Sequence, residues 1–472
     1  FWTEAASLGV FGMTETAVRI PPLLFGLLSM LAVAALGSGA FGETAGLVAG
    51  ICYGTLALPL GVSEIAVHDV ALPPFICAAS LALLKIERRR GTGWWTIVAG
   101  TALGLSVLTK GLVGVAFTGL FAVCLAVARP AAAVRIGIAL AVALFIAGLI
   151  GAPWYLAMER AHPGYIHYYL IDRHVLGYLT PTQQHAGRGW WYYVPILFAG
   201  ALPWTAYLIG AVTRARVKPL MTVVWAWLAT GFLFLTFAHS KLDTYALPLF
   251  IPLALIVGEY VENAVAGSRR DRLFGALFAI HASVLAAVPA AALAMVSAHF
   301  GTRIALPFWV AALAAGGCVA WTAWAAAHDH RAFPMLRAFG GMTVISVAAV
   351  VLLAVPRAAD WMTQRGIAAV LNQSGALPPS VSIVDERVGS LVFYLAPQLR
   401  HQATPGTFPD TSLVDAYERA RVGPASAIVA VRDDQLAKFV ALFAHPPAGA
   451  TKAGTFTLYR AGDLRRVIRR FP

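Results

Sequence analysis

The chain has 472 residues, of which 59% are hydrophobic and 12% charged. Soluble domains carry about 25% charged residues, so this composition excludes an ordinary soluble globular protein. The formal net charge is +13, but most Lys and Arg residues lie in short loops between apolar segments or in the C-terminal tail. Such a distribution forms no basic face for nucleic acid, and membrane topology explains the loop charges better. The four cysteines fall inside apolar segments and are predicted to be small buried hydrophobes.

Apolar windows of about 17–25 residues recur along most of the chain, which indicates membrane-spanning helices. We predict about twelve spans, at roughly 20–37, 44–62, 70–86, 94–109, 112–128, 136–155, 191–212, 219–238, 243–262, 273–297, 304–326 and 338–356. Alternate loops are rich in Lys and Arg, at residues 85–90, 129–135, 214–218, 269–272 and 331–337. The positive-inside rule assigns these loops to the cytoplasm, so the other loops and everything after about residue 357 are expected outside.

The first stretch, FWTEAASLGVFGMTETAVRIPP, matches neither a signal peptide nor a complete span. Twelve spans return a chain to its starting side, so Phe1 is also expected outside. We therefore expect at least one further span before this sequence, which would give thirteen in the full-length protein.

Residues 357–472 differ in character from the apolar region 1–356, and the sequence predicts a separate domain there. VSIVD (381–385), SAIVAVR (426–432) and FTLYRA (456–461) have the pattern of buried strands, and DDQLAKFVALFA (433–444) that of an amphipathic helix. We predict a small α/β domain of about 115 residues, long enough to fold alone, on the periplasmic side. It has no Walker loop, dinucleotide-binding motif or Cys/His metal spacing.

Ionisable residues near the outer ends of spans are costly there, so each is a helix cap, a headgroup anchor or part of a site. Asp69 precedes a span with prolines in its first turns, which fits a helix cap or a catalytic carboxylate at the mouth of a cavity, and the two roles are compatible. Lys110 interrupts an apolar run at a Thr-Lys-Gly turn. It fits either a lysine that extends into interfacial water or a cation that faces a phosphate.

The outer segment 159–193 is dense in Tyr, Trp and His, and most of these aromatics fit an interfacial anchoring belt. Its ionisable members are less easily explained by such a belt: Asp172, Arg173, His174, His185 and Arg188. A single His is more often hydrogen-bonded within the structure than bound to a metal, so both interpretations of His185 stay open.

A second outer segment is the turn in FAHSKLDTYALPLFIPLAL (237–255), which brings together Ser240, Lys241, Asp243 and Tyr245. This clustering favours a site over a charged turn. The outer face as a whole suits a substrate with an anionic headgroup and a lipid tail. Cations can pair with phosphate, aromatics can stack on sugar rings, and a carboxylate can act as general base.

Several of these segments resemble the bacterial lipid A aminoarabinose transferases, which belong with the protein O-mannosyltransferases to the C-type glycosyltransferases. The resemblance runs from the opening FWTEAASLGVFGMTETAVRIPP through Asp69, LTKG (108–111) and QQHAGRGWWYYVPILFAGALPW (183–204) to SKLDTYALPLFIPLAL (240–255). The last segment is the most specific. The family has thirteen spans, with its first acidic motif in the loop after span one, and neither that motif nor the Lys-Pro-Pro segment before Phe1 is present here.

The resemblance implies an inverting transfer of a sugar from a polyprenyl phosphate to an acceptor such as lipid A, at the outer face of the bacterial inner membrane. It implies that Asp69 is an acidic catalytic residue, and that Arg188, Lys241, Tyr245 and, more weakly, Lys110 contact the donor. His185 carries over as a divalent-metal ligand, and no other cofactor is implied. The sequence indicates neither the sugar, the acceptor nor the oligomeric state.

Two other classes of function compete with this enzyme. A transporter or flippase for a lipid-linked solute should show charged or broken helices near mid-membrane and paired repeats. Here the ionisable residues collect at one face and no internal repeat is visible, which favours surface chemistry. A non-catalytic subunit of glycan assembly stays an alternative.

Overall fold

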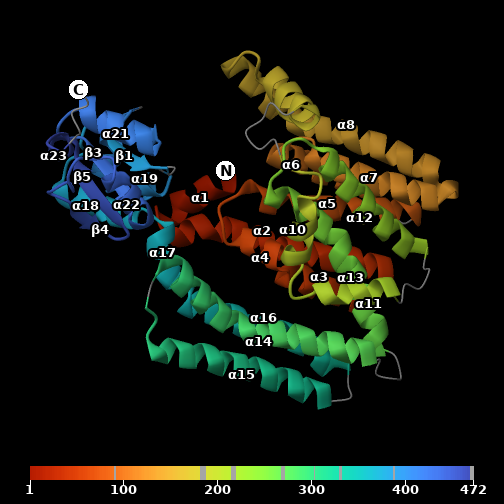
Figure 1. The fold of residues 1–472 in the computed structure, drawn as a ribbon. Coiled ribbons are helices and arrows are strands. Elements are labelled where there is room, and N and C mark those ends of the chain that lie inside the picture. Colours follow the sequence, from red (N-terminus) through yellow and green to blue (C-terminus); the bar gives the residue numbers. More distant parts are fainter. Residues whose placement is uncertain are drawn as a thin grey trace. The chain divides into compact units, whose positions relative to one another are not determined.

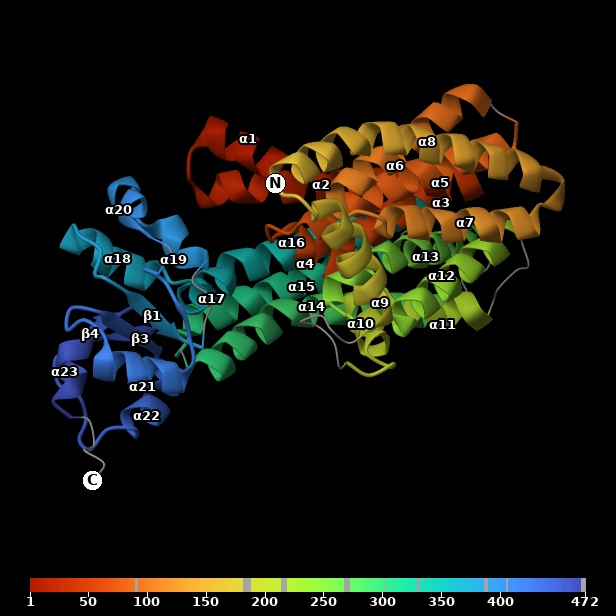
Figure 2. The same cartoon turned by 90° about the horizontal axis from the view of Figure 1, so that it is seen from above.

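The computed structural model describes residues 1–89, 92–180, 188–213, 219–266, 272–301, 303–328, 332–385, 389–404 and 406–467. They form two compact units: Phe1–Ala287 with Gly317–Ile345, and Val288–Gly316 with Ser346–Pro472. Figures 1 and 2 show that the first unit is helical and that the sheet belongs to the second.

The helices of the first half of the chain belong wholly to the first unit: α1 (Trp2–Phe11), α2 (Glu15–Phe41), α3 (Glu43–Thr55), α4 (Ala57–Ser63), η1 (His68–Ala71), α5 (Leu72–Glu87), α6 (Thr92–Lys110), α7 (Val113–Ala128), α8 (Pro130–Ala161), η2 (His167–Leu176) and α9 (Gly177–Leu179). These are followed by α10 (Tyr193–Gly200), α11 (Thr205–Thr213), α12 (Pro219–Phe237), η3 (Asp243–Leu249) and α13 (Phe250–Ala266). Three long helices, α14 (Arg272–Phe300), α15 (Leu306–His328) and α16 (Ala332–Leu353), run through both units.

Within the described residues, seven helices are long and apolar enough to cross a membrane, or up to nine if each of two bent pairs is one span. The bent pairs are α3–α4, with a 63° bend, and α10–α11, with a 99° bend. The chain is thus a polytopic α-helical membrane protein, as predicted. The three remaining predicted spans coincide with α6, α7 and α16, of which α7 has only 16 residues. The count of twelve stays a prediction.

The centre of the first unit is formed by α2, α3, α5 and α13, which lie side by side (Figures 1 and 2). Small residues let these helices approach closely. A Cβ added at Gly258 of α13 would lie only 2.7 Å from the Ala45 carbonyl oxygen of α3. The spans that end in α5 and α13 are the most enclosed, at 78% and 83% buried, whereas that of α8 is 22% buried. Two central spans therefore carry the residues described below, and α8 lies at the periphery.

The second unit contains a five-stranded sheet in the order β2-β1-β3-β5-β4. Its strands are β1 (Val381–Val384), β2 (Asp410–Thr411), β3 (Ile428–Arg432), β4 (Thr451–Ala453) and β5 (Phe456–Arg460). Strand β1 pairs in parallel with β2 and β3, and β5 pairs antiparallel with β3 and β4. The strands predicted at 381–385, 426–432 and 456–461 are confirmed.

Helices cover both faces of this sheet, because β1 and β3 carry apolar side chains on both sides. One apolar cluster joins the sheet to α18 (Arg365–Ser374) and α19 (Gly389–Tyr394), and the other joins it to α21 (Leu413–Val422) and α22 (Asp433–Val440). The predicted helix at 433–444 is therefore present but ends at Val440. The unit also contains α17 (Val355–Met362), α20 (Pro397–Gln402) and α23 (Ala461–Arg465).

Candidate active site

Two 3₁₀ segments lead into the two most enclosed spans of the first unit, and they contact each other. Segment η1 precedes α5, and η3 precedes α13. Val70 of η1 and Leu247 of η3 share a buried apolar cluster with Val62 of α4. This packing places Asp69 of η1 beside Thr244 of η3, although 175 positions separate them in the sequence.

Asp69 forms a buried ion pair with Lys110. The Lys110 ammonium donates to Oδ1 of Asp69, and the Thr244 hydroxyl donates to Oδ2 at 2.8 Å. The side chains of Asp69 and Lys110 are only 9% and 14% exposed. The N-cap of α5 is Ala71, without a side-chain capping bond, so the helix-cap interpretation of Asp69 is wrong. Its carboxylate is instead the centre of a polar cluster at the end of a central span.

Lys110 is the last residue of α6, and its ammonium lies 4.1 Å from the centroid of the Tyr245 ring, a cation–π contact. Its burial and its ion pair rule out a lysine that extends into interfacial water. The next residue, Gly111, has φ +61°, a conformation that favours glycine. A Cβ there would lie 2.3 Å from Nε2 of His174, so the turn after Lys110 has no room for a side chain.

His174 belongs to the π-helical segment η2 and connects it to the end of α6. Its Nδ1 lies 2.6 Å from the Tyr169 carbonyl oxygen, and its Nε2 lies 3.4 Å from the Lys110 carbonyl oxygen. Tyr169 stacks on Tyr165 at 5.7 Å between ring centroids, and the Tyr155 hydroxyl donates to the Val107 carbonyl. Burial raises the pKa of Tyr169 above its ordinary value, so this phenol stays a hydrogen-bonding group at neutral pH.

A second polar group lies on the same turn as Thr244. Arg188 Nη1 is 3.6 Å from Oδ1 of Asp243, and the Tyr192 hydroxyl donates to the same oxygen. The Arg188 guanidinium also lies 4.6 Å from the centroid of the Tyr192 ring. Arg188 and Asp243 are 39% and 62% exposed, so this pair is far wetter than Asp69–Lys110 and contributes less to stability.

Lys241 precedes this turn and is buried, with 4% exposure. Its ammonium donates to the Ala238 carbonyl oxygen. Burial lowers the pKa of Lys241, because desolvation penalises the charged form. A buried cation whose described hydrogen bond goes to a carbonyl dipole is well placed to pair with an incoming anion.

The structure therefore brings most of the predicted site residues together. Lys110 contacts both Asp69 and Tyr245 directly. Asp243, which pairs with Arg188, lies on the same turn as Tyr245, and Lys241 lies just before it. His185 lies outside the described residues. Among the residues that are described, no group of three or more His, Cys, Asp and Glu side chains could hold a metal.

Three contacting residues were not identified from the sequence: Thr244, Tyr155 and Tyr192. Thr244 lies between two residues that were, so its position in SKLDTY was a usable signal. Tyr155 and Tyr192 had no such signal, because tyrosines near membrane interfaces are common for reasons of anchoring alone.

The chain is also similar to known proteins, both in sequence and in structure. Residues 1–155 match the model of the dolichyl-phosphate-mannose-protein mannosyltransferase family. An undecaprenyl phosphate-α-4-amino-4-deoxy-L-arabinose arabinosyl transferase of Enterobacter sp. (strain 638) is 30% identical over 298 residues, which is 61% of this chain and 53% of that protein. The same-named protein of Pectobacterium atrosepticum is 30% identical over 315 residues, covering 64% of this chain and 56% of its own length.

Among solved structures, ArnT from Cupriavidus metallidurans bound to undecaprenyl phosphate superposes with a TM-score of 0.72 at 21% identity, covering 98% of this chain and 86% of that chain. Its apo form gives 0.69 at 20% identity, covering 100% and 88%. The chain is thus similar to the protein mannosyltransferase family over residues 1–155 and to these arabinosyl transferases over a longer stretch. The aligned part spans about half the length of the arabinosyl transferases it matches. The structural likeness shows that the chain shares the fold of this solved protein.

Proposed function

We propose that this protein is an inverting glycosyltransferase that moves a sugar from a polyprenyl-phosphate donor to an acceptor such as lipid A. The observation that carries the proposal is the buried Asp69–Lys110 pair, which lies beside the 241–245 turn at the ends of two central spans. Similarity to relatives that are named arabinosyl transferases supports the donor class.

The carboxylate of Asp69 is the proposed general base. Each carboxylate oxygen can accept more than one hydrogen bond, so Asp69 can hold Lys110 and Thr244 and still accept an acceptor proton. The acceptor oxygen then bonds to the anomeric carbon as the bond from that carbon to the carrier phosphate breaks. The configuration inverts, and the proton from an acceptor hydroxyl goes to Asp69.

Cations and aromatics near this carboxylate have proposed roles in donor binding. Lys110, Lys241 and Arg188 would pair with the charge of the polyprenyl phosphate as it leaves, and the Tyr245 ring offers a stacking surface for the sugar. His185 is retained as a hypothetical divalent-metal ligand. Because the described residues alone supply no metal-binding group, no step of this mechanism passes through a metal.

The proposed topology follows from the loop charges. Residues 1–356 would form a transmembrane domain with twelve spans in the bacterial inner membrane. Residues 357–472 would form an α/β domain in the periplasm, on the same side as Asp69. The Lys- and Arg-rich loops support this orientation. When the predicted spans are counted, each of these loops falls on the side of the membrane opposite to Asp69.

The test uses full-length protein in inner-membrane vesicles supplied with polyprenyl-phosphate sugars. Mass spectrometry of extracted lipid A should show added sugar, and Asp69→Asn should lower its rate of formation by at least ~100-fold, the usual scale for a lost general base. The matched control is Asp434→Asn, which removes an exposed carboxylate of α22 and should transfer at the wild-type rate. Donor consumption without sugar on lipid A would move the acceptor elsewhere. Absence of donor consumption by well-expressed protein would overturn the enzyme proposal.

A further inference from the structure

A groove opens between α6 and α8, at the end of α6 that is remote from the active site. Its volume is about 580 Å³, within the usual size range of ligand sites. Thr92 begins α6 and Lys110 ends it, so a helix rise of 1.5 Å per residue places the α6 residues of the groove, Thr92 to Ile97, roughly 20–27 Å from Lys110 along the axis. The groove and the candidate active site therefore lie towards opposite faces of the membrane.

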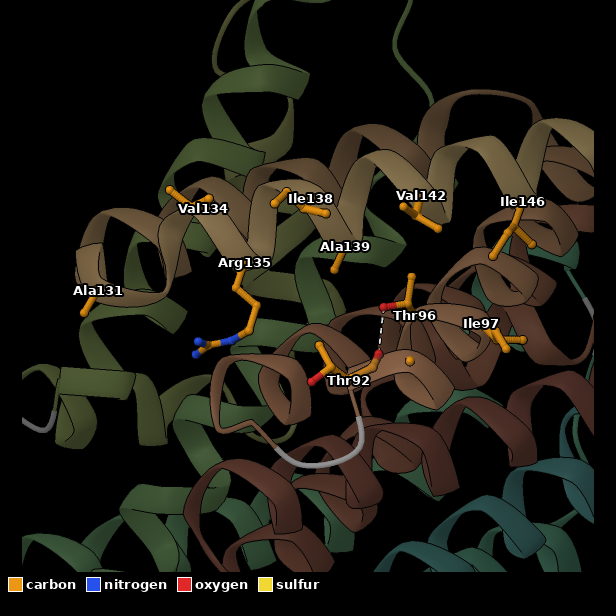
Figure 3. Close-up of a pocket in the computed structure, with 11 residues that line it drawn as sticks. Thr92, Thr96, Ile97, Ala131, Val134, Arg135, Ile138, Ala139, Val142 and Ile146 are labelled. Atoms are coloured by element: carbon orange, nitrogen blue, oxygen red, sulfur yellow. Dashed lines mark hydrogen bonds between the residues drawn. The ribbon is translucent and has the colours of Figure 1, made fainter.

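The groove is apolar along its length and polar at one end. Ile97, Ile138, Val142 and Ile146 line the apolar part, whereas Arg135 lies with Thr92 towards the helix starts (Figure 3). Arg135 and Ile146 are separated by roughly 16 Å along α8. The groove closes near Ile146, because a Cβ added at Gly100 of α6 would lie 2.6 Å from the Ile146 Cβ.

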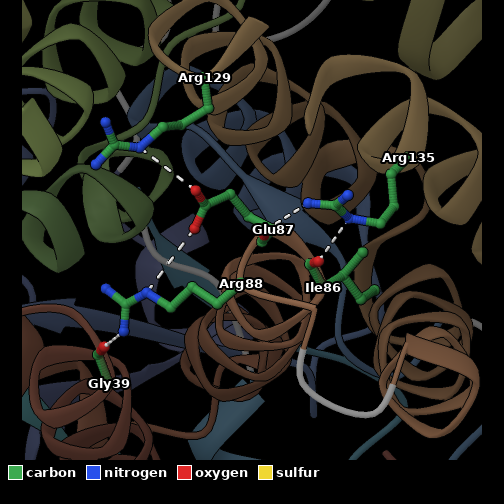
Figure 4. A network of polar contacts seen from close by, with 6 residues as sticks. All are labelled: Gly39, Ile86, Glu87, Arg88, Arg129 and Arg135. Atoms are coloured by element: carbon green, nitrogen blue, oxygen red, sulfur yellow. Dashed lines mark hydrogen bonds and ion pairs between the residues drawn. The ribbon is translucent and has the colours of Figure 1, made fainter. Parts of the chain in front are cut away.

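The polar end has a surplus of positive charge. Glu87 forms ion pairs with both nearby arginines. Arg129 Nε lies 3.4 Å from its Oε1, and Arg88 Nε lies 3.8 Å from its Oε2 (Figure 4). Arg135 donates only to backbone carbonyls among the residues that the structure describes, from Nε to Ile86 at 2.9 Å and from Nη2 to Glu87 at 2.5 Å. Its guanidinium therefore has no carboxylate partner within the described part of the chain and has N–H groups left to donate.

We propose that this groove binds one anionic phospholipid of the adjoining leaflet, with an acyl chain between α6 and α8 and its phosphate on Arg135. The charge of the groove suits an anionic headgroup, because the Arg135 end carries more cationic than acidic side chains. Lys85 and Arg89, which are close to Glu87 in the sequence, add to this positive charge. The shape fits an acyl chain better than a protein side chain, since the apolar part runs along α8, whose span is only 22% buried. The exposed apolar lining supports this: Val134 is 76% and Ile138 62% exposed.

This site is separate from the proposed donor site in both position and ligand. It holds a structural lipid by its phosphate and one chain, and it takes no part in the transfer of sugar. Bound there, the lipid would join α6, α8 and the end of α5, and so stabilise the helix whose other end carries Lys110.

The test is native mass spectrometry of the intact protein released from nanodiscs of phosphatidylcholine and phosphatidylglycerol. Wild type should retain phosphatidylglycerol in excess of its share in the nanodisc. Arg135→Gln should lower that excess about fivefold, the scale expected for one Arg near an anionic headgroup. Arg272→Gln is the matched control, because it removes an arginine at the start of α14, outside the groove lining.

A second pair of variants tests the shape of the groove independently of the Arg135 charge. It keeps the proposal testable even where Arg135→Gln does not fold. Val134→Trp fills the groove, whereas Val127→Trp adds the same bulk at an equally exposed valine of α7 outside it. Only Val134→Trp should lose the retained lipid. Equal losses in Arg135→Gln and Arg272→Gln, unchanged retention in Val134→Trp, or a dimer that Val134→Trp abolishes would each overturn the proposal.

Discussion

The Asp69–Lys110 pair makes a graded prediction about stability. Both side chains are largely buried, and removing one partner of a buried ion pair costs about 3–5 kcal/mol. Lys110→Met should lie at the upper end of that range, because it leaves the Asp69 carboxylate with only the Thr244 hydroxyl bond among its described contacts. Asp69→Asn should lie at the lower end, because the amide oxygen still accepts a hydrogen bond. The double variant leaves no unpaired charge and should be more stable than Lys110→Met alone.

The assay is unfolding of the purified protein in mixed micelles, followed by tryptophan fluorescence. Lys241→Met serves as the matched control, since it removes a buried lysine whose ammonium is held by a carbonyl rather than a carboxylate. Its loss should be well below that of Lys110→Met. If the two single substitutions simply add in the double variant, the two side chains do not interact and the geometry of the pair is refuted.

Activity distinguishes the catalytic from the structural role of the same pair. Asp69→Asn and the double variant should both transfer sugar at least ~100-fold more slowly than wild type, because restoring the charge balance does not restore the base. Recovery of stability without recovery of turnover supports Asp69 as the base. A double variant that transfers at the wild-type rate would assign Asp69 a structural role only.

Two further predictions concern the same region. Gly111→Ala should destabilise the protein by at least about 1–2 kcal/mol, since the φ of +61° at this position disfavours alanine and the new Cβ would displace His174. Gly148→Ala is the control, because a Cβ at Gly148 meets no neighbouring atom. It should be neutral or stabilising in the same unfolding assay. Burial lowers the pKa of Lys241 below its ordinary value of 10.5, so between the lowered value and 10.5 the unfolded chain binds more protons and stability should rise with pH. Lys241→Met should lack this rise, and parallel stability curves for the two proteins would contradict it.

The sequence predicted that the site residues share one face of the membrane, but not which of them touch. Asp69, Lys110 and the 240–245 turn each follow or precede an apolar run, and counting runs assigns them to the same side. The bond from Thr244 to Asp69 joins residues 175 positions apart, and no periodicity of either helix encodes that contact. It depends on how α4, η1 and η3 pack through Val70 and Leu247, which is a property of shape.

In the α/β unit, too, the sequence predicted only the elements that have a pattern of their own. The three buried strands are apolar runs and were predicted, whereas β4 is exposed at two of its three residues and β2 has only two residues, so neither gives a recognisable pattern. The helix predicted at 433–444 ends at Val440, and the apolar residues that follow, such as Phe443, still pack in the core without helical geometry. Strand order is set by pairing between segments, which no single segment contains.

The placement of the polar cluster on α5 and α13 has a physical reason. An ionisable side chain on a lipid-facing helix would lie in hydrocarbon without a partner, at a cost of several kcal/mol. On the two most enclosed spans, a buried ionisable group meets protein instead and can be paired, as Asp69 is with Lys110 and Thr244. The peripheral helix α8, which is largely exposed, instead presents apolar side chains along most of its length and keeps Arg135 for its end. The proposed chemistry at the centre and the proposed lipid contact at the rim thus both follow from the same difference in burial.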